Sequence, residues 1–287
     1  MHSHFYQAIA WQRPLGWGTR LIRQEFDLLK MPGFYLPLNP KGCHVLADAL
    51  GDTPETVISV HLLRRGLCRA YVAGNPSRFD GAIIQDNFCP AEPMGFGSDP
   101  EVLWELLQAV RGWECVNVAP ECAAALGGII EKNVGIPVRY YGDIYHVLSK
   151  PVVNFSNEAV RQLTLADIKL LESAPAEVRG GGFGSTRGLL SDGIVACAVV
   201  SGHIVSIAHT HARSDHHADI GAFTLEVWRG RGFATAAAAI VARRVKEAGQ
   251  TPVWSTGEDN LASLRVAQKL GFTEVSQRTY VILDKSR

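Results

Sequence analysis

The chain has 287 residues, which is enough for one large domain or two domains of ordinary size. Its 47% apolar and 20% charged residues are typical of a soluble globular protein and exclude an intrinsically disordered chain. The formal net charge is +0, so bulk electrostatics favours neither a nucleic acid nor an anionic membrane as a partner.

The cysteines and the N-terminal residues indicate the cellular compartment of the protein. Six cysteines are scattered without metal-ligand spacing, at Cys43, Cys68, Cys89, Cys115, Cys122 and Cys197. Most of them lie in apolar runs, where a buried free thiol is the usual state. The first residues lack the basic start and apolar core of a signal peptide, and no apolar stretch is long enough to span a bilayer. We therefore expect a cytoplasmic protein.

Helix-type and strand-type patterns alternate through the first half of the chain. Ser98 or Asp99 is suited to cap a helix whose first turn contains Pro100. The elements expected, in order, are helices at 20–29, 44–50 and 54–64, strands at 69–73 and 81–85, a helix at 101–110, a strand at 114–119, a helix at 121–132 and a strand at 140–148.

The pattern begins again near Asn157. Thr164 and Asp167 form a pair like a capping box, and Gly180–Gly184 is either a plain connector or a flexible cover over a binding site. The further elements expected are a hairpin of strands at 194–200 and 203–211, strands at 219–224, 252–256 and 279–283, and helices that start at 233 and at 260. The apolar stripe of the last helix is expected to consist of Leu261, Leu264, Ala267 and Leu270.

The two halves repeat one order of elements, which predicts a tandem fold with domains at 1–155 and 156–287. The first copy lacks the arginines found in the corresponding turn of the second. It instead has Ser98-Asp-Pro-Glu101 at its helix start, where the carboxylates would repel a phosphate. Three roles are therefore open for the first half. It shapes an acceptor pocket, it acts as an internal dimer partner, or it only contributes to the hydrophobic core.

A turn with two glycines and two arginines separates the strand at 219–224 from the helix that starts at Phe233. Such a turn directs several backbone N–H groups outward at the positive end of the helix dipole. Arg229 and Arg231 add positive charge beside them. The stretch predicts an anion site, and its alternative is a solvated basic turn before a core helix.

The same turn, Arg229–Ala234 (Arg-x-x-Gly-x-Ala), resembles the pyrophosphate loop of the GNAT superfamily of N-acetyltransferases. Asn260–Ser263 (Asn-x-x-Ser) and Lys269–Phe272 (Lys-Leu-Gly-Phe) resemble the second motif of that family at the expected distance. The resemblance implies an α+β fold of two GNAT-like domains. Each is expected to be a mixed, mostly antiparallel twisted sheet flanked by helices, with a V-shaped splay between the central strands of the second domain.

Two branches of the family share further features with this chain. Trp254-Ser255, together with Thr224 at the end of the central strand, is similar to the branch of the zwittermicin-resistance acetyltransferases. The tandem length with a degenerate first half is similar to the glycine N-acyltransferases. Both resemblances imply acyl transfer from a coenzyme A thioester directly to a primary amine of a small molecule.

The resemblance also places the coenzyme. The pantetheine arm would lie between Ile220–Thr224 and Val253–Thr256 as an added strand, and the pyrophosphate would lie on the N–H groups of the loop. Acetyl-CoA is the expected donor, and no metal is expected. The residues implied in coenzyme binding are Phe223, Thr224, Arg229, Gly230, Arg231, Gly232, Phe233, Ala234, Thr235, Asn260 and Ser263.

The sequence identifies no single residue as the general acid or the general base of the reaction. Many family members have a Tyr general acid seven residues after the Asn of the second motif, where this chain has Ala267. Ser255, Thr256 and Ser263 are alternatives, although a thiolate leaves without help. The candidates for the general base are Glu226, His209 and His211, with His217 and Asp219 nearby. The histidines between 209 and 217 are otherwise solvated turn residues.

Two other functions stay open at this point. The missing Tyr is compatible with a non-catalytic acyl-CoA sensor, and an open groove would suit a protein N-acetyltransferase. The extra half-domain favours a small-molecule acceptor. We expect no nucleic acid or membrane partner, and either a monomer or a homodimer.

Overall fold

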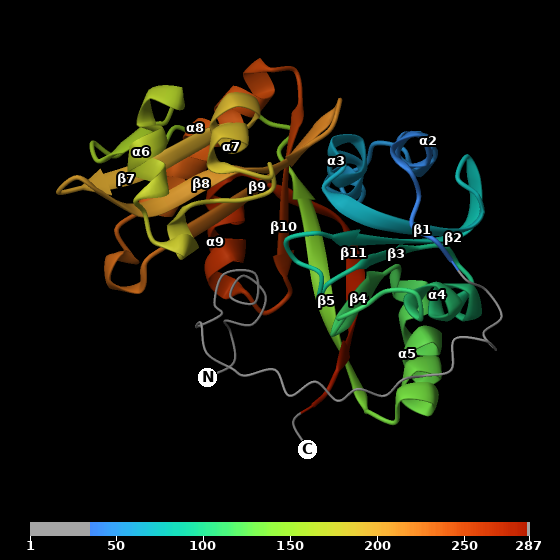
Figure 1. Cartoon of the computed structure of the whole chain (residues 1–287). Helices are drawn as coiled ribbons and strands as arrows, with labels where there is room; N and C mark the ends of the chain where they lie inside the picture. Colours follow the sequence, from blue (N-terminus) through green and yellow to red (C-terminus); the bar gives the residue numbers. More distant parts are fainter. Residues whose placement is uncertain (1–34, 286–287) are drawn as a thin grey trace.

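The computed structural model describes residues 35–285, and these residues form a mixed α/β molecule in which helices flank one large sheet (Figure 1). The helix expected at 20–29 lies outside the described residues. The mixed fold class expected from the sequence is confirmed. None of the helices within 35–285 combines the length and the apolar character needed to cross a membrane.

The described part of the first half contains the expected helices and strands in order, together with one short strand (Met94–Phe96) that was not predicted. These are α2 (Pro40–Leu50), α3 (Val57–Arg65), β1 (Cys68–Asn75), β2 (Arg78–Asp86), β3 (Met94–Phe96), α4 (Pro100–Leu107), β4 (Cys115–Val118), α5 (Pro120–Val134) and β5 (Val138–Val147).

The second half contains the expected elements in order, and one helix (Thr186–Asp192) and three short 3-10 turns are additions that were not predicted. Its elements are β6 (Val160–Gln162), η1 (Leu165–Asp167), α6 (Ile168–Glu172), η2 (Ala176–Val178), α7 (Thr186–Asp192), β7 (Val195–Val200), β8 (His203–Arg213), β9 (His217–Thr224), η3 (Glu226–Trp228), α8 (Phe233–Glu247), β10 (Thr251–Gly257), α9 (Leu261–Leu270) and β11 (Thr273–Leu283).

The internal repeat is visible in the strand directions. In each half an antiparallel hairpin (β1–β2, β7–β8) is followed by a third antiparallel strand (β3, β9), a helix (α4, α8) and a strand parallel to the third (β4, β10). A second helix (α5, α9) then leads to a long antiparallel last strand (β5, β11). The two halves are therefore copies of one arrangement.

The strands of both halves form one continuous 11-stranded sheet, in the order β1-β2-β3-β4-β11-β5-β10-β9-β8-β7-β6. The halves exchange their last strands. β11 lies between β4 and β5, and β5 lies between β10 and β11, as the crossing green and red strands of Figure 1 show. The two domains were each expected to have a sheet of their own, and the structure joins these sheets into one.

Buried polar side chains fix this joint. Arg278 of β11 donates to the carbonyl oxygens of Gly95 on β3 (2.6 Å) and Asn117 on β4 (3.0 Å). The Asn117 side chain in turn donates to Asp143 of β5 at 3.0 Å. Burial raises the pKa of the Asp143 carboxyl to about 6. A one-residue slip of β11 would leave these groups unpaired in the interior, so they specify the register.

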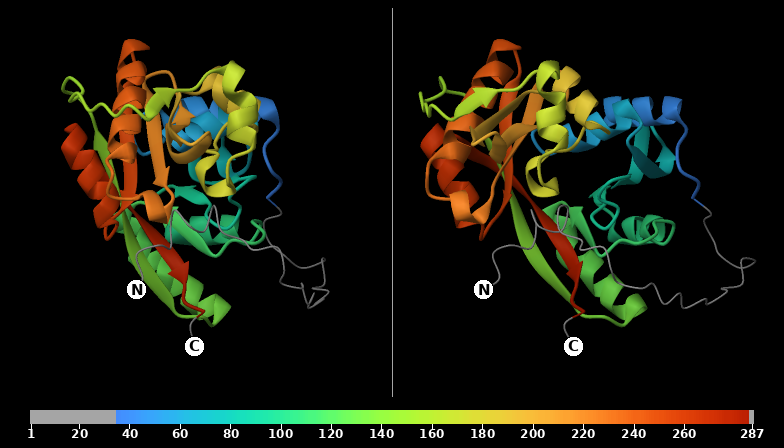
Figure 2. Two further views of the ribbon diagram at one scale, coloured as in Figure 1. Left: turned by 90° about the vertical axis from the view of Figure 1, so that its left-hand side faces the viewer. Right: turned by 60° about the vertical axis from the view of Figure 1, so that its left-hand side comes forward.

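Helices cover both faces of the second half of the sheet (Figure 2). α8 and α9 pack on one face, where the alanines of α8 let its backbone approach β8 and β9 closely. α6 and α7 pack on the other face of β7 and β8. α3 of the first half also lies against β8 and β9, so that the first half contacts the central strands of the second.

Local sequence signals act as expected at most helix ends. Asp99 caps α4 by accepting from the N–H groups of Glu101 and Val102, and the capping box of Thr164 and Asp167 is present. The expectation for Leu261 is wrong. Leu261 is 61% exposed because it is the first residue of α9 and lies outside the buried face, which Ser263, Ala267 and Leu270 form.

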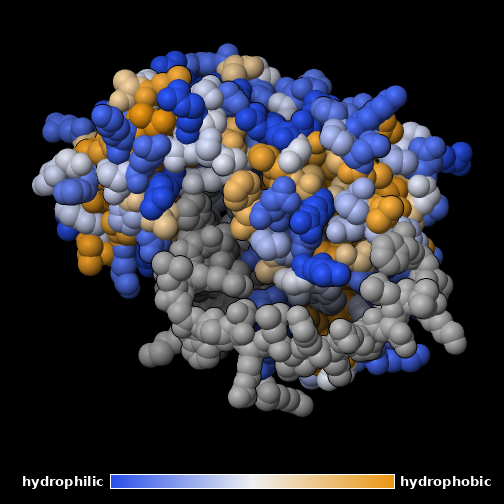
Figure 3. All heavy atoms as spheres, viewed as in Figure 1, coloured by the Kyte–Doolittle hydropathy of each residue, from blue (hydrophilic) through white to orange (hydrophobic). Residues whose placement is uncertain are grey.

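The described surface carries mainly polar side chains. Hydrophilic and hydrophobic residues are interspersed over the face shown in Figure 3. The exposed apolar side chains Leu36, Phe88 and Val227 belong to different segments. All six cysteines are free thiols, and Cys43, Cys115, Cys122 and Cys197 are buried.

Candidate active site

The two parallel central strands of the second half separate partway along their length. β9 and β10 pair only from His217 opposite Thr251 to Asp219 opposite Val253. Beyond that point β9 stays paired with β8 as far as Thr224, and β10 stays paired with β5. Each strand follows its outer neighbour, so a fork opens between 220–224 and 254–257. Backbone groups that face the fork have no strand partner there.

The fork opens toward the N-terminus of α8. Gly230 and Gly232 both adopt a φ of 78°, a left-handed conformation that glycine accepts without strain. No atom lies within 4 Å of a Cβ built at either residue, so the backbone is open to close approach. Gly232 is the N-cap of α8 and provides no side-chain cap. The N–H groups of the first turn of α8 are therefore available to an anion.

Basic side chains and a cavity adjoin these N–H groups. The Arg231 guanidinium lies 4.5 Å from the centre of the Trp228 ring, and Arg229 Nε donates to the carbonyl oxygen of Thr224 at 3.3 Å. A cavity of about 280 Å³ lies beside the loop. Its lining residues are Phe155, Ser156, Asn157, Arg231, Gly232, Thr235, Ala236 and Lys269. Lys269 of α9 thus faces the same space as Arg231.

Asp219 marks the point where the strands separate. Its side chain is 3% exposed and accepts a hydrogen bond from Ser255 Oγ at 2.9 Å across the fork. Burial raises the pKa of the Asp219 carboxyl to about 7, with the Asp143 charge adding to the effect and the Ser255 hydrogen bond opposing it. The group is therefore a carboxyl that exchanges a proton near neutral pH.

The histidines predicted as bases lie near Asp219, but burial lowers their pKa values whereas it raises that of Asp219. His209 lies opposite Gly221 on β8, on the face of the sheet that carries Asp219, and it is 6% exposed. Burial lowers its pKa to about 4, and its Nδ1 lies 2.9 Å from the Thr210 carbonyl oxygen. His211 lies at the bulge of β8, and burial lowers its pKa as well. Both rings are neutral at physiological pH.

Glu226 is not brought to the fork point. Glu226 lies exposed in η3, between the end of β9 and the loop at 229–232. The five steps from Asp219 to Thr224 alone span about 17 Å along a strand, at about 3.3 Å for each step. Phe223 and Thr224 end β9 and are held by Ser206 of β8, whose hydroxyl donates to Phe223 O at 3.1 Å and contacts Thr224 Oγ1 at 2.7 Å.

The residues of the second motif have structural partners. Asn260 caps α9 by accepting from the Ser263 N–H at 3.1 Å, and Ser263 Oγ accepts from Trp254 Nε1 at 2.9 Å. Ala267, which stands in the place of the family's tyrosine, is fully buried. Thr256 Oγ1 is different, because this buried hydroxyl oxygen has no hydrogen-bond partner among residues 35–285. Successive strand residues point to opposite faces, so Thr256 and Ser255 face different sides of β10.

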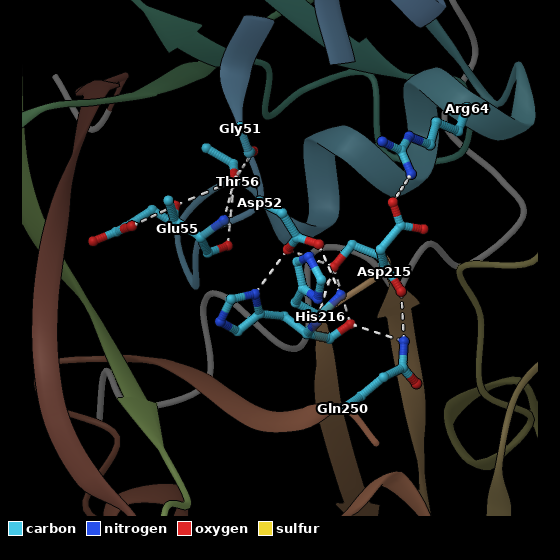
Figure 4. Close-up of polar contacts among 11 residues, drawn as sticks. Gly51, Asp52, Glu55, Thr56, Arg64, Asp215, His216 and Gln250 are labelled. Atoms are coloured by element: carbon cyan, nitrogen blue, oxygen red, sulfur yellow. Dashed lines mark hydrogen bonds and ion pairs between the residues drawn. The ribbon is translucent and has the colours of Figure 1, made fainter. Parts of the chain in front are cut away.

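The first half is clamped onto the turn between β8 and β9, which the sequence did not indicate (Figure 4). Asp52, in the link between α2 and α3, accepts from Ser214 Oγ (2.7 Å) and the His216 N–H (2.8 Å), and lies 2.7 Å from His217 Nδ1. Burial opposes ionisation of the Asp52 carboxyl, but these hydrogen bonds outweigh it and lower its pKa. The carboxylate is therefore charged at neutral pH and holds three donors of the second half.

A second contact between the halves runs through His61 of α3. The Arg213 N–H donates to His61 Nδ1 at 3.2 Å, which leaves Nε2–H to donate to the Gly182 carbonyl oxygen at 2.8 Å. Burial lowers the pKa of His61, in agreement with a neutral ring. Through this contact the glycine loop at 180–184 is fixed to α3, over the face of the sheet that carries His209 and Asp219.

A family model and several solved structures match this chain. Residues 162–282 match the family model described as GNAT acetyltransferase. The fold is similar to a GCN5-related N-acetyltransferase-like protein from Streptococcus suis, at 22% identity and a TM-score of 0.60, over 84% of this chain and 98% of the other. No curated protein matches the sequence.

Two further solved structures share the fold. A tandem GNAT protein from the clavulanic acid biosynthesis pathway matches at 14% identity and a TM-score of 0.55, over 86% of this chain and 97% of the other. A GCN5-related N-acetyltransferase from Kribbella flavida matches at 14% identity and a TM-score of 0.53, over 84% of this chain and 95% of the other. These likenesses extend over both halves of the chain.

Proposed function

The chain carries a GNAT acetyltransferase domain at residues 162–282, and we propose that it transfers the acetyl group of acetyl-CoA to a primary amine of a small molecule. The observation that carries the proposal is the fork between β9 and β10 beside an uncapped helix N-terminus. The resemblance to the zwittermicin-resistance and glycine N-acyltransferase branches remains a prediction.

The residues at the fork fit coenzyme A as a co-substrate. The N–H groups of the first turn of α8 would hold the pyrophosphate, and the open space at Gly230 and Gly232 allows its close approach. Arg231 and Lys269 face the adjoining cavity, where they would neutralise a further phosphate. The unpaired backbone groups of β9 and β10 would hydrogen-bond the pantetheine amides as an added strand does.

Asp219 is the residue we assign as the proton acceptor. The amine nitrogen forms the new C–N bond as the C–S bond breaks, and a nitrogen that becomes an amide must release its proton. A carboxyl with a pKa of about 7 accepts that proton at neutral pH far better than His209, whose pKa is about 4. Ser255 holds the Asp219 carboxylate toward the fork. The Thr256 hydroxyl lies on the other face of β10 from Ser255, so we assign no proton donor to the sulfur, which leaves as a thiolate.

The closed acceptor side favours a small molecule over a protein. α3 and the loop at 180–184 cover the face of β8 and β9 that carries His209 and Asp219. A Cβ at Gly182 would lie 1.8 Å from the His211 carbonyl oxygen, so the loop contacts the sheet directly. A peptide needs an extended open groove at this face, and the loop occupies that space.

The test of this proposal is coenzyme binding and turnover in paired variants. Gly232→Glu places bulk and negative charge where the pyrophosphate would bind, and we expect it to abolish acetyl-CoA binding in calorimetry. Gly249→Glu is the matched control, because Gly249 has the same φ of 78° and the same open surroundings at the other end of α8. It should impose similar backbone strain and leave the affinity within about twofold.

Thiol release from acetyl-CoA, measured against a broad panel of small amines, tests the reaction itself. Release that depends on one class of amine supports the proposal and identifies the acceptor. Tight binding without turnover across the panel would instead indicate an acyl-CoA sensor. Equal affinity of Gly232→Glu and Gly249→Glu for acetyl-CoA would refute the assignment of the loop.

A further inference from the structure

A second cavity, separate from the fork, lies at the junction of the two halves. It has a volume of about 280 Å³, near the lower end of the range of about 300–1,000 Å³ that is usual for small-molecule sites. α3 of the first half supplies one wall, and the end of β8, α7 and Gln250 supply the other. Its lining residues are His61, Arg64, Arg65, Phe183, Asp192, Arg213, Ser214, Asp215 and Gln250.

Arg213 is the lining residue whose charge is least satisfied. Its Nε and Nη2 donate to the neutral Gln250 Oε1 at 3.0 and 2.6 Å, and its Nη1 donates to the Asp192 carbonyl oxygen at 2.8 Å. A guanidinium has five N–H donors, and these contacts use three of them. No carboxylate forms an ion pair with Arg213 within the described part of the chain. Burial lowers the pKa of Arg213, and the nearby charge of Asp192 opposes this shift.

The other charged groups at the cavity form ion pairs with one another. Arg64 pairs with Asp215 at 2.6 Å and with Asp48 at 3.2 Å, and Arg65 pairs with Asp192 at 2.6 Å. Three carboxylates therefore contact Arg64 and Arg65, and His61 is neutral. The Asp215 and Asp192 side chains are 65% and 46% exposed, so these pairs are held weakly and a ligand can compete for the arginines. Arg213 is the arginine of this cavity that makes no ion pair within residues 35–285.

We propose that this cavity binds a small oxyanion, a phosphate or a carboxylate, on Arg213 with Arg65 and Arg64. One unused N–H group remains on each Nη nitrogen of Arg213, and these two groups can donate to the oxygens of an anion. Arg64 and Arg65 reach the cavity from α3, whereas Arg213 belongs to β8. An anion held between them ties the first half to the second. His61 connects the same cavity wall to the loop at 180–184.

The experiment measures anion binding to the full-length protein by calorimetry, with inorganic phosphate and with succinate as separate probes. Sodium chloride keeps the ionic strength constant. The measurement is made in the Gly232→Glu background, so that phosphate cannot occupy the loop at α8 and the result does not depend on the proposed function. We expect one site for at least one probe, with a dissociation constant of millimolar or below. Phosphate alone, succinate alone or both identify the class of oxyanion.

The variants locate the site. Arg213→Gln should weaken binding at least tenfold, and Arg213→Lys should restore part of it because the charge remains without the fork. Arg65→Gln, which removes a more exposed arginine, should weaken binding about threefold and keeps the test valid if Arg213→Gln does not fold. Arg69→Gln, at an exposed position on β1 outside the cavity, is the control. Absence of binding for both probes, or binding that none of the cavity variants weakens, overturns the proposal.

Discussion

The buried carboxyl of Asp219 should control both the pH dependence of the reaction and the stability of the fold. With a pKa of about 7, it is about one-tenth ionised at pH 6 and about nine-tenths ionised at pH 8. If Asp219 accepts the proton, kcat/KM should fall tenfold for each pH unit below 7. Asp219→Asn should lower kcat/KM by about 10² to 10⁴, the usual contribution of a general base, and should remove this acidic limb.

The same substitution should stabilise the protein at high pH. The pKa of Asp219 is raised on folding from 3.8 to about 7, so between these values the folded state binds the proton and the unfolded state does not. The contribution of Asp219 to the free energy of unfolding is therefore fully present below pH 4 and is lost as the pH rises toward 7. Since one pKa unit corresponds to about 1.4 kcal/mol, the loss approaches about 4 kcal/mol.

Urea unfolding of the wild type and Asp219→Asn at pH 5 and pH 8 measures this difference. Glu92, whose pKa burial also raises, contributes to both proteins and cancels in the comparison. Asp143 is coupled to Asp219, so the substitution also removes the repulsion between the two carboxylates, which adds to the gain of the variant at high pH. We expect the variant to gain several kcal/mol relative to the wild type between pH 5 and pH 8, while its activity is lost. An acidic limb that persists in Asp219→Asn would refute the assignment of the base. Equal pH dependence of unfolding in both proteins would refute the buried ionisation.

Three other substitutions test single contacts. Ser255→Ala removes the hydrogen bond that lowers the pKa of its partner carboxyl, so the acidic limb of kcat/KM should move to higher pH in the same rate profiles. Asp52→Ala should lower the free energy of unfolding by about 3 kcal/mol in urea titrations, because it removes a charged acceptor shared by three donors. The control Asp48→Ala, at a side chain that is 74% exposed, should change this free energy by less than about 0.5 kcal/mol. Gly182→Ala forces a Cβ to 1.8 Å from the His211 carbonyl oxygen, so the melting temperature should fall by several degrees in calorimetry.

The elements around the loop could be predicted because their signals are local. Two glycines before an alanine-rich run predict the turn and the start of α8, and both glycines do adopt positive φ. Asp99 before Pro100 predicts the start of α4 in the same way, and its side chain makes the expected cap. Each of these features depends on the backbone preferences of neighbouring residues, which are readable from the chain alone.

The exchange of β5 and β11 could not be predicted, because the choice of a strand partner is a tertiary property. β5 and β11 have similar apolar patterns, and either half could have kept its own last strand. The sequence also does not show that Asp219 is a better candidate base than His209. That difference arises because burial raises the pKa of a carboxyl and lowers the pKa of an imidazole. Asp52 belongs to a short polar link, and nothing in its surroundings along the chain indicates its contacts across the junction.

The position of β11 has a consequence for the synthesis of the protein. The first half needs this strand to fill the place between β4 and β5, yet β11 leaves the ribosome after every other strand of the described sheet. Until β11 emerges, β4 and β5 expose unpaired edges that can associate with other nascent chains. The N-terminal copy therefore cannot mature ahead of the C-terminal copy, and a chain truncated before Thr273 leaves both copies incomplete rather than one.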